Sequence, residues 1–405
     1  MGAKGLRDLL FEYTHIQGLF CFENRKTIFE GVDSRFKFVV LTFEKTSVPR
    51  LLAVGESNAS APPDDLLAPT RTGAQGTTRF PAAFMRHDVV ELERFPSDGA
   101  LWLDVELIRK LAPDSHSLME FKSELDVEIA QKMLRFPMLG ARLEGKWNCV
   151  LARELHMTDD SHLFKNEAAP GRLPLYEGKM VWQFDSDYAK PRYWIDDHEG
   201  RLSLLGRDAG DDRILDYQTY RLGFRDIARN TDTRTLICSV TAQTFHGNKL
   251  PALRIFDGDG ERLITNLEQL FLCAVWNSFV VDWMVRQKVT ATLNFFYLYQ
   301  LPVPRIGHGD SAIAAYAERA ARLICTAPKF DALANEAGLR DHRDGATEPA
   351  ERARLRAELD GLVAHLYGLS EDEFVHILAT FPLVPEPVKQ AARNAYRDVE
   401  RGLIR

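Results

Sequence analysis

The sequence predicts an α+β multidomain protein, and three observations support that prediction. Its 405 residues are enough for two or three domains. Short apolar runs rich in aromatic and β-branched residues, bounded by turn residues, predict strands near the start and in the middle of the chain. Residues 306–405 form a helical C-terminal region, because apolar side chains recur there at helical spacing with charges on the opposite face.

The composition narrows the class of protein. Hydrophobic residues make up 45% of the chain and charged residues 27%, as in ordinary globular proteins. No run of eighteen apolar residues and no amino-terminal apolar segment occurs, so we expect neither a membrane span nor a secretory signal. The five cysteines are dispersed without a C-x-x-C pair, which argues against a zinc ribbon and suits a cytoplasmic protein.

The first 45 residues predict an incomplete sheet. The runs IQGLFCF (16–22) and FKFVVLTF (36–43) are typical of buried strands, and GLRDLLFEY (5–13) before them of the end of a helix. Two strands and part of a helix cannot bury a core alone. We therefore expect residues 1–45 to be the end of a larger sheet or to dock on one.

The next two segments are predicted to connect domains. Residues 46–85 are dense in Gly, Ser, Pro, Thr and Asp, which predicts a loop or linker. Residues 86–145 are predicted to be a helical connector. Within them Ser123 and Asp126 are placed to cap a helix over DVEIAQKMLRF (126–136).

Residues 146–305 predict a mixed α+β domain. Strand-like runs occur at WNCVLAREL (147–155), MVWQF (180–184), RYWI (192–195) and LICSV (236–240). A single helix is predicted over 267–287, and LPVP (301–304) ends the domain. In the helical region beyond, Pro349 is predicted to begin a helix.

Common catalytic motifs are absent from the sequence. It contains no P-loop, no G-x-S-x-G elbow and no H-E-x-x-H helix. FDGDGER (256–262) lacks the distal Glu of a calcium loop and predicts a hairpin turn. PSDGALWLDVEL (96–107) has the acidic residues of a metal nuclease, but the Lys expected after Glu106 is missing. We therefore predict no catalytic residue and no metal site, and an independent nuclease is disfavoured.

Polar side chains among aromatics are the remaining functional signal. YRLGFRDIARNTDTRT (220–235) carries four arginines, and further Lys and Asn residues follow in 243–249 and 285–304. Arg and Asn read base edges, whereas Lys holds phosphates. The alternative for any one residue is an internal role, such as Arg225 pairing with Asp226 or Asp232. The set as a whole favours a polyanion-facing surface, and the candidate DNA-binding residues are Lys179, Gln183, Arg225, Arg234, Asn248, Lys249, Lys288 and Asn294.

Several segments together resemble the carboxy-terminal part of type IIG-like restriction–modification and phage-defence adenine-specific DNA methyltransferases. They are FENRKTIFEGVDSRFKFVVLTFEK (22–45), LPLYEGKMVWQFD (173–185), YRLGFRDIARNTDTRTLI (220–237), the run from WNSFVVDWMVRQKV to LNFFYLYQLPVP (276–304) and LDGLVAHLYGLSEDEFVHIL (359–378). The resemblance implies that the strands in 1–45 close a class I methyltransferase-like sheet. It also implies that 146–305 is a target recognition domain for double-stranded DNA.

The sequence departs from that family in one respect. The Gly-rich cofactor loop and the Asn-Pro-Pro-Tyr motif, which would hold a flipped adenine, are both missing. No catalytic or cofactor residue is therefore carried over, and the chain is expected to be inactive alone. S-adenosylmethionine is expected on the missing catalytic part or on a partner chain, beside which other defence-system subunits can be present. The alternative is a non-catalytic interaction or scaffold subunit that docks on a partner methylase by strand addition.

Overall fold

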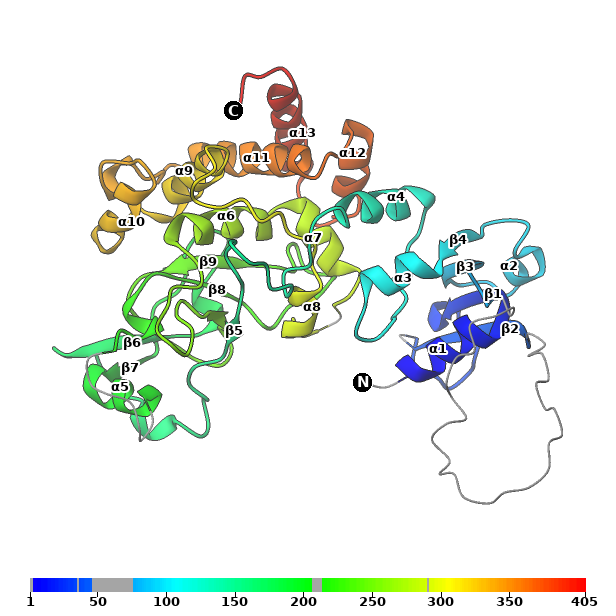
Figure 1. Ribbon diagram of the computed structural model, residues 1–405, viewed down its shortest axis with the longest axis horizontal. Coiled ribbons are helices and arrows are strands. Elements are labelled where there is room, and N and C mark those ends of the chain that lie inside the picture. Colours follow the sequence, from blue (N-terminus) through cyan, green and yellow to red (C-terminus); the bar gives the residue numbers. More distant parts are fainter. Residues whose placement is uncertain (1–2, 35, 46–75, 206–212, 290) are drawn as a thin grey trace. The chain divides into compact units, whose positions relative to one another are not determined.

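A computed structural model describes residues 3–34, 36–45, 76–205, 213–289 and 291–405. The chain divides into two compact units, Met1–Glu128 and Ile129–Arg405. Both units mix helices and strands (Figure 1), which confirms the predicted α+β class. Each unit has its own core.

The unit Met1–Glu128 is built on a four-stranded sheet of order β2-β1-β3-β4. Strand β1 is antiparallel to β2 and parallel to β3. Phe20, Phe22 and Ala83 form part of its core. The elements are α1 (Lys4–Tyr13), β1 (Thr14–Glu23), β2 (Lys37–Lys45), β3 (Arg79–Arg86), α2 (Val90–Arg94), β4 (Leu101–Asp104) and α3 (Val105–Leu111). The predicted helix and both predicted strands are confirmed, but the expectation that both strands are buried was wrong for β2, whose side chains are mostly exposed at the edge of the sheet. The place of these elements in a methyltransferase sheet stays a prediction.

Two expectations for the connecting segments were wrong in part. Strand β3 occupies the end of the predicted 46–85 loop; residues 46–75 lie outside the described residues. Strand β4 lies inside the predicted 86–145 helical connector. Pro81 obscured β3, because proline lacks a backbone donor and disfavours a central strand. The strand forms nonetheless because Phe80, Ala82 and Ala83 are almost fully buried between β1 and β4.

The unit Ile129–Arg405 contains two small sheets. Their orders are β10-β6-β7 and β5-β11-β8-β9. The elements are β5 (Leu151–Ala152), β6 (Arg172–Tyr176), β7 (Tyr193–Asp196), α5 (Asp197–Leu205), β8 (Arg221–Phe224), β9 (Cys238–Thr241), β10 (Phe245–His246) and β11 (Ala252–Leu253). The strands predicted at 192–195 and 236–240 are confirmed, as is the turn at 256–262, where Phe256 pairs with Arg262.

The predicted strand MVWQF was wrong, because the backbone turns there. A 3₁₀ turn covers Gly178–Met180, the Trp182 amide donates to the Asp185 carbonyl at 2.7 Å, and Phe184 has a positive φ of 57°. The strand ends just before, at Tyr176. Val181 and Phe184 are buried, so the apolar pattern correctly predicted burial but did not predict the turned backbone.

The helix predicted over 267–287 is two helices, α6 (Asn266–Trp276) and α7 (Phe279–Arg286). Ser278 ends the first run by capping the second, since its hydroxyl accepts from the Val281 amide at 3.3 Å. The Asn277 side chain meanwhile donates to the Cys238 carbonyl of β9 at 3.0 Å. The predicted cap at Ser123 is confirmed at the start of α4 (Glu124–Met133).

The carboxy-terminal region is helical, as predicted. It comprises α9 (Ile313–Ile324), α10 (Asp331–Glu336), α11 (Pro349–Leu366), α12 (Glu371–Ala379) and α13 (Glu386–Glu400), after the short α8 (Phe295–Tyr299). Pro349 begins α11, which confirms that prediction. Helix α11 packs against α13, and Gly361 permits the close approach because a Cβ there would lie 2.8 Å from the Ala395 backbone.

Candidate nucleic-acid interface

Four cationic side chains from separate segments gather on one face of the unit Ile129–Arg405. We call this the basic face; it consists of Arg153, Lys179, Arg225 and Lys249, with Asn248 and Asn294 beside them. Arg153, Arg225 and Lys249 come from the loops that follow β5, β8 and β10, and Lys179 comes from the turn after β6. The face therefore depends on the folding of both small sheets.

The centre of the basic face is the buried carboxylate of Asp226. Its side chain is 1% exposed and faces the Lys249 ammonium at 3.3 Å and the Arg153 guanidinium at 3.6 Å. The Arg153 Nε also donates to the Asn248 carbonyl at 3.2 Å. One buried acid thus draws two cations together, while half of the Lys249 side chain stays exposed to solvent.

Arg225 is held rigidly at the second edge of the basic face. Its Nε donates to the Val181 carbonyl at 2.6 Å, and its guanidinium lies 4.9 Å from the centre of the Trp182 ring. Trp182 in turn stacks on the exposed ring of Tyr188, with centroids 5.4 Å apart. Burial lowers the pKa of Arg225, yet a guanidinium stays protonated in proteins. The result is a fixed planar cation between two aromatic rings and solvent.

A glycine lets the Lys179 turn reach this surface. A Cβ on Gly178 would lie 2.6 Å from the Lys249 carbonyl oxygen, so only glycine fits without displacing the neighbouring chain. The Lys179 ammonium is more than half exposed and pairs with Glu177 at 3.0 Å. The Lys179 carbonyl accepts from Arg225 at 3.5 Å, which joins this turn to the rest of the face.

The segment 291–294 brings Asn294 to the same surface. The Leu293 amide donates to the Asp226 carbonyl at 2.7 Å, and Ala228 donates to Ala291 at 3.2 Å. Asn294 is exposed at the start of α8 and its side chain makes no capping hydrogen bond there. Its amide therefore lies at the rim of the basic face.

Three of the eight candidate residues lie elsewhere and have internal partners. Gln183 is 9% exposed and donates to the Asn277 carbonyl at 3.0 Å. Arg234 is 6% exposed, donates to the same carbonyl and pairs with Asp282 at 3.2 Å. Lys288 is half-buried and donates to the Gln300 carbonyl at 3.3 Å; burial lowers its pKa to about 8. These side chains support the fold beneath the surface rather than forming it.

Sequence reasoning missed Arg153, Asp226 and Tyr188 as parts of the site. Arg153 lies in a run interpreted as a core strand, and nothing in the sequence places it beside residues 226 and 248. The one available signal for Asp226 was its place directly after Arg225, in a segment that carries four arginines. Among the described residues, three of the four cations of the basic face form ion pairs with two carboxylates, Glu177 and Asp226, although the whole chain has a net charge of −7.

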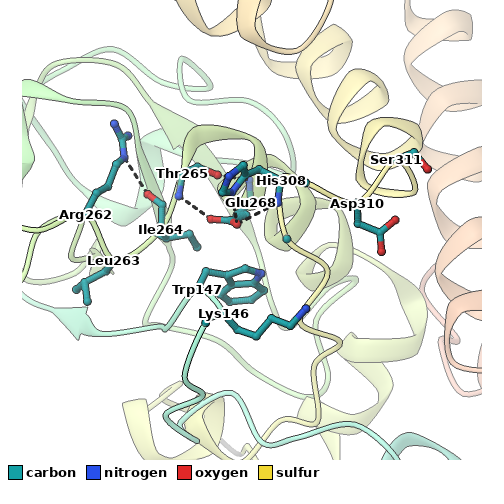
Figure 2. Close-up of a pocket in the computed structure, with 13 residues that line it drawn as sticks. Lys146, Trp147, Arg262, Leu263, Ile264, Thr265, Glu268, His308, Asp310 and Ser311 are labelled. Carbon is teal, nitrogen blue, oxygen red and sulfur yellow. Dashed lines mark hydrogen bonds and ion pairs between the residues drawn. The ribbon is translucent and has the colours of Figure 1, made fainter.

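A hollow of about 790 Å³ lies between the loops around Trp147 and Gly307–Ser311 (Figure 2). At its base the buried carboxylate of Glu268 accepts from the Thr265 amide at 2.8 Å and from the ring and amide of His308 at 3.1 Å each. The Thr265 contact is the capping box of α6. Glu268 therefore has a structural task, and its two oxygens are already occupied.

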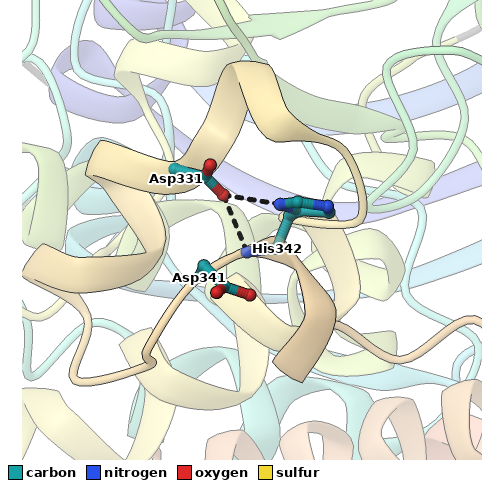
Figure 3. A group of neighbouring side chains, drawn as sticks. All are labelled: Asp331, Asp341 and His342. Carbon is teal, nitrogen blue, oxygen red and sulfur yellow. Dashed lines mark hydrogen bonds and ion pairs between the residues drawn. The ribbon is translucent and has the colours of Figure 1, made fainter.

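Asp331, Asp341 and His342 bring potential metal-ligand atoms within 4.8 Å of one another (Figure 3). Asp331 accepts from the His342 amide at 2.9 Å and from its ring at 2.7 Å. The guanidinium of Arg343 pairs with Asp341 and holds the pKa of that carboxyl below its usual range. Internal partners thus neutralise this half-buried cluster, and it offers no built site for a cation.

Comparison with solved structures gives a weak structural likeness. No protein-family model matches the sequence, and no curated protein matches it. The fold aligns with the structure of the Type IIL restriction-modification enzyme MmeI in complex with DNA, at a TM-score of 0.33 and 9% sequence identity. The alignment covers 96% of this chain and 46% of that chain, so the chain spans less than half the length of that protein. A TM-score this low does not establish a shared fold.

Within the described ranges, no helix combines the length and the apolar character that crossing a lipid bilayer requires.

Proposed function

We propose that the chain is the sequence-specific DNA-recognition part of an N6-adenine DNA methyltransferase of a restriction–modification or phage-defence system. The single observation that supports this most is the basic face, on which Arg153, Lys179, Arg225 and Lys249 converge from separate segments. A surface of this kind on an acidic chain is the electrostatic footprint of a polyanion site. The assignment to a restriction–modification or phage-defence system rests on the sequence resemblance.

The chemistry of the basic face suits double-stranded DNA. Lys179 and Lys249 have flexible, exposed ammonium groups, which bind phosphates as point charges. Arg225 is pre-oriented and can donate bidentately to guanine, while the amides of Asn248 and Asn294 have the donor and acceptor that adenine requires. Phosphate and base-reading groups thus lie on one continuous surface.

The proposal assigns methyl transfer to a partner chain. The printed sequence contains neither a Gly-rich cofactor loop nor an Asn-Pro-Pro run. S-adenosylmethionine and the pocket for the target adenine would therefore be supplied by that partner. The chain would select the DNA sequence and the partner would perform the chemistry.

DNA binding is tested by selecting duplexes from a random library with the purified chain and measuring affinity by fluorescence anisotropy at several salt concentrations. The affinity is expected to fall with a log–log slope of about −0.9 for each phosphate contact. Lys249→Gln should weaken binding to all duplexes and reduce that slope by about one. Arg225→Gln should cost about 1–3 kcal/mol and relax specificity at one base pair.

Arg340→Gln is the matched control. This arginine is 87% exposed and pairs with Asp344 in a loop before α11, and its substitution removes the same single charge. It should leave affinity and slope unchanged. Equal losses in Arg340→Gln and Lys249→Gln would show that overall charge, and not the basic face, attracts DNA. Absence of DNA binding both by the chain alone and by the chain together with a methyltransferase encoded beside it would refute the proposal.

A second function, a non-catalytic scaffold that docks on a partner methylase, is favoured by strand β2. Its outer edge pairs with no other strand among the described residues, and Val39 and Phe43 are about half exposed. An exposed apolar edge strand is a template for strand addition. Docking at β2 should barely respond to salt, whereas DNA binding should weaken steeply. Val39→Lys and Phe43→Lys should abolish docking and spare DNA binding.

A further inference from the structure

A cavity of about 340 Å³ lies between the α6–α7 junction, helix α11 and the start of α13. Its walls are mostly apolar and include Trp182, Phe279, Val384 and Val388. This volume is within the range of small-molecule sites, which are apolar hollows with a few placed polar groups. None of the four residues that form the cationic part of the basic face lines it.

The charged groups that line the cavity differ in one respect. Arg234 has its partners in the Asn277 carbonyl and the Asp282 carboxylate. Asp360 accepts from the Phe279 amide at 2.9 Å. Arg356 alone among the three is half-buried and takes part in no hydrogen bond or ion pair with any residue that the structure describes. Asp360, four residues further along α11, attracts the guanidinium electrostatically but makes no direct ion pair with it. The hydrogen-bond donors of Arg356 are therefore open to an anion that enters the cavity.

We propose that this cavity binds a small molecule with an apolar body and one anionic group. The body would lie against the apolar walls, and the anionic group would accept hydrogen bonds from Arg356. Charge complementarity selects the anion: Arg234 is already paired with Asp282, so the guanidinium of Arg356 is the donor left for a ligand. The ligand class is thus an aromatic or branched aliphatic carboxylate, sulfonate or phosphate ester.

Asp360 opposes the anion and makes the site sensitive to pH. Burial raises the pKa of Asp360 to about 6, and Asp282 adds to the shift, whereas Arg234, Arg356 and the Phe279 amide act against it. Above that pH the carboxylate repels an anionic ligand, and below it the neutral acid does not. Affinity for an anion should therefore rise as the pH falls from about 7.5 to about 5.5.

The probe is naphthalene-2-sulfonate, which stays ionised across this range, and its neutral isostere is naphthalene-2-sulfonamide. Both are titrated into the full chain by isothermal calorimetry. The sulfonate is expected to bind, more tightly at the lower pH, and the sulfonamide about tenfold more weakly with no pH dependence. Arg356→Leu should reduce sulfonate affinity about tenfold and leave the sulfonamide unchanged.

Arg354→Leu is the matched control, because Arg354 lies on the same helix but pairs with Glu358 outside the cavity. It should bind both probes as the parent does. Ala391→Phe fills the cavity from α13 and should abolish binding of both probes, with folding checked by thermal denaturation. Failure of the sulfonate to bind, equal affinity for the two probes, or unchanged sulfonate affinity in Arg356→Leu would each overturn the proposal.

Discussion

At the residue scale, the same side-chain types serve two purposes in this protein. Arg225 and Arg234 lie in one sequence cluster, yet Arg225 borders the surface while Arg234 is almost fully buried. Arg234 belongs to a network centred on Asp282, which is 0% exposed. The Asp282 carboxylate accepts from the amides of Thr235 and Leu236 and faces Arg234 and Arg286 at 3.2 and 3.7 Å. A buried acid thus holds the 229–237 loop onto α7.

Asp282→Asn is expected to destabilise the fold by about 3–5 kcal/mol, because it leaves two buried arginines without a counter-charge. Urea unfolding followed by circular dichroism measures the change in unfolding free energy. Asp259→Asn, in the exposed turn after β11, is the control and should stay within about 0.5 kcal/mol of the parent. A loss in Asp282→Asn no larger than that of the control would show that the network contributes little to stability.

At the element scale, caps decide where helices begin, and they override the apolar pattern. Residues 267–287 are apolar enough for one helix, yet Asn277 and Ser278 divide them. The division turns α7 so that Asp282 reaches the 229–237 loop and Phe279 reaches the cavity beside Arg356. A short polar pair in an apolar run therefore positions both the buried carboxylate of Asp282 and one wall of the cavity.

Ser278→Ala should destabilise the protein by about 1 kcal/mol, since it removes the hydroxyl that accepts from the Val281 amide. Thermal unfolding by calorimetry reports the loss. Ser311→Ala is the comparison, because Ser311 is exposed and is not the capping residue of α9. If both variants unfold at the same temperature as the parent, the break between α6 and α7 does not depend on this cap.

At the scale of the whole molecule, the two compact units separate the two proposed functions. The basic face and the apolar cavity both belong to Ile129–Arg405, while the exposed edge of β2 belongs to Met1–Glu128. Helix α4 crosses the boundary, and its last turns, with Ile129, Ala130 and Met133 fully buried, belong to the second unit. A fragment has to keep this helix and its cap.

The fragment 123–405 is expected to fold alone and to bind DNA as tightly as the full chain, because it contains the Ser123 cap and the whole basic face. Circular dichroism and fluorescence anisotropy test the two expectations. The fragment 134–405 is the control: it lacks Lys132, whose ammonium pairs with Glu373 at 2.6 Å, and the four buried apolar residues Val127, Ile129, Ala130 and Met133. It should unfold at a lower temperature. Loss of DNA binding in the folded fragment 123–405 would show that the first unit contributes to recognition.

Much of the secondary structure follows from local physics that a sequence displays. The strands at 16–22 and 36–43, the helix after Ser123 and the helix beginning at Pro349 were predicted from apolar period, caps and proline, and each is confirmed. Strand β3 and the turns within 180–184 were not, because burial between neighbouring strands and a positive φ at Phe184 are set by contacts distant in sequence.

By itself the sequence determined the α+β class, the helical carboxy-terminal region and the presence of polar clusters among aromatics. Only the tertiary structure decided which of those polar groups face solvent. Arg153 and Lys249 meet at Asp226, and Arg225 contacts the Lys179 turn beside them, whereas Gln183 and Arg234 turn inward to Asn277. The physical reason is that period and propensity act within a few residues, while a charged side chain is buried or exposed according to partners far along the chain.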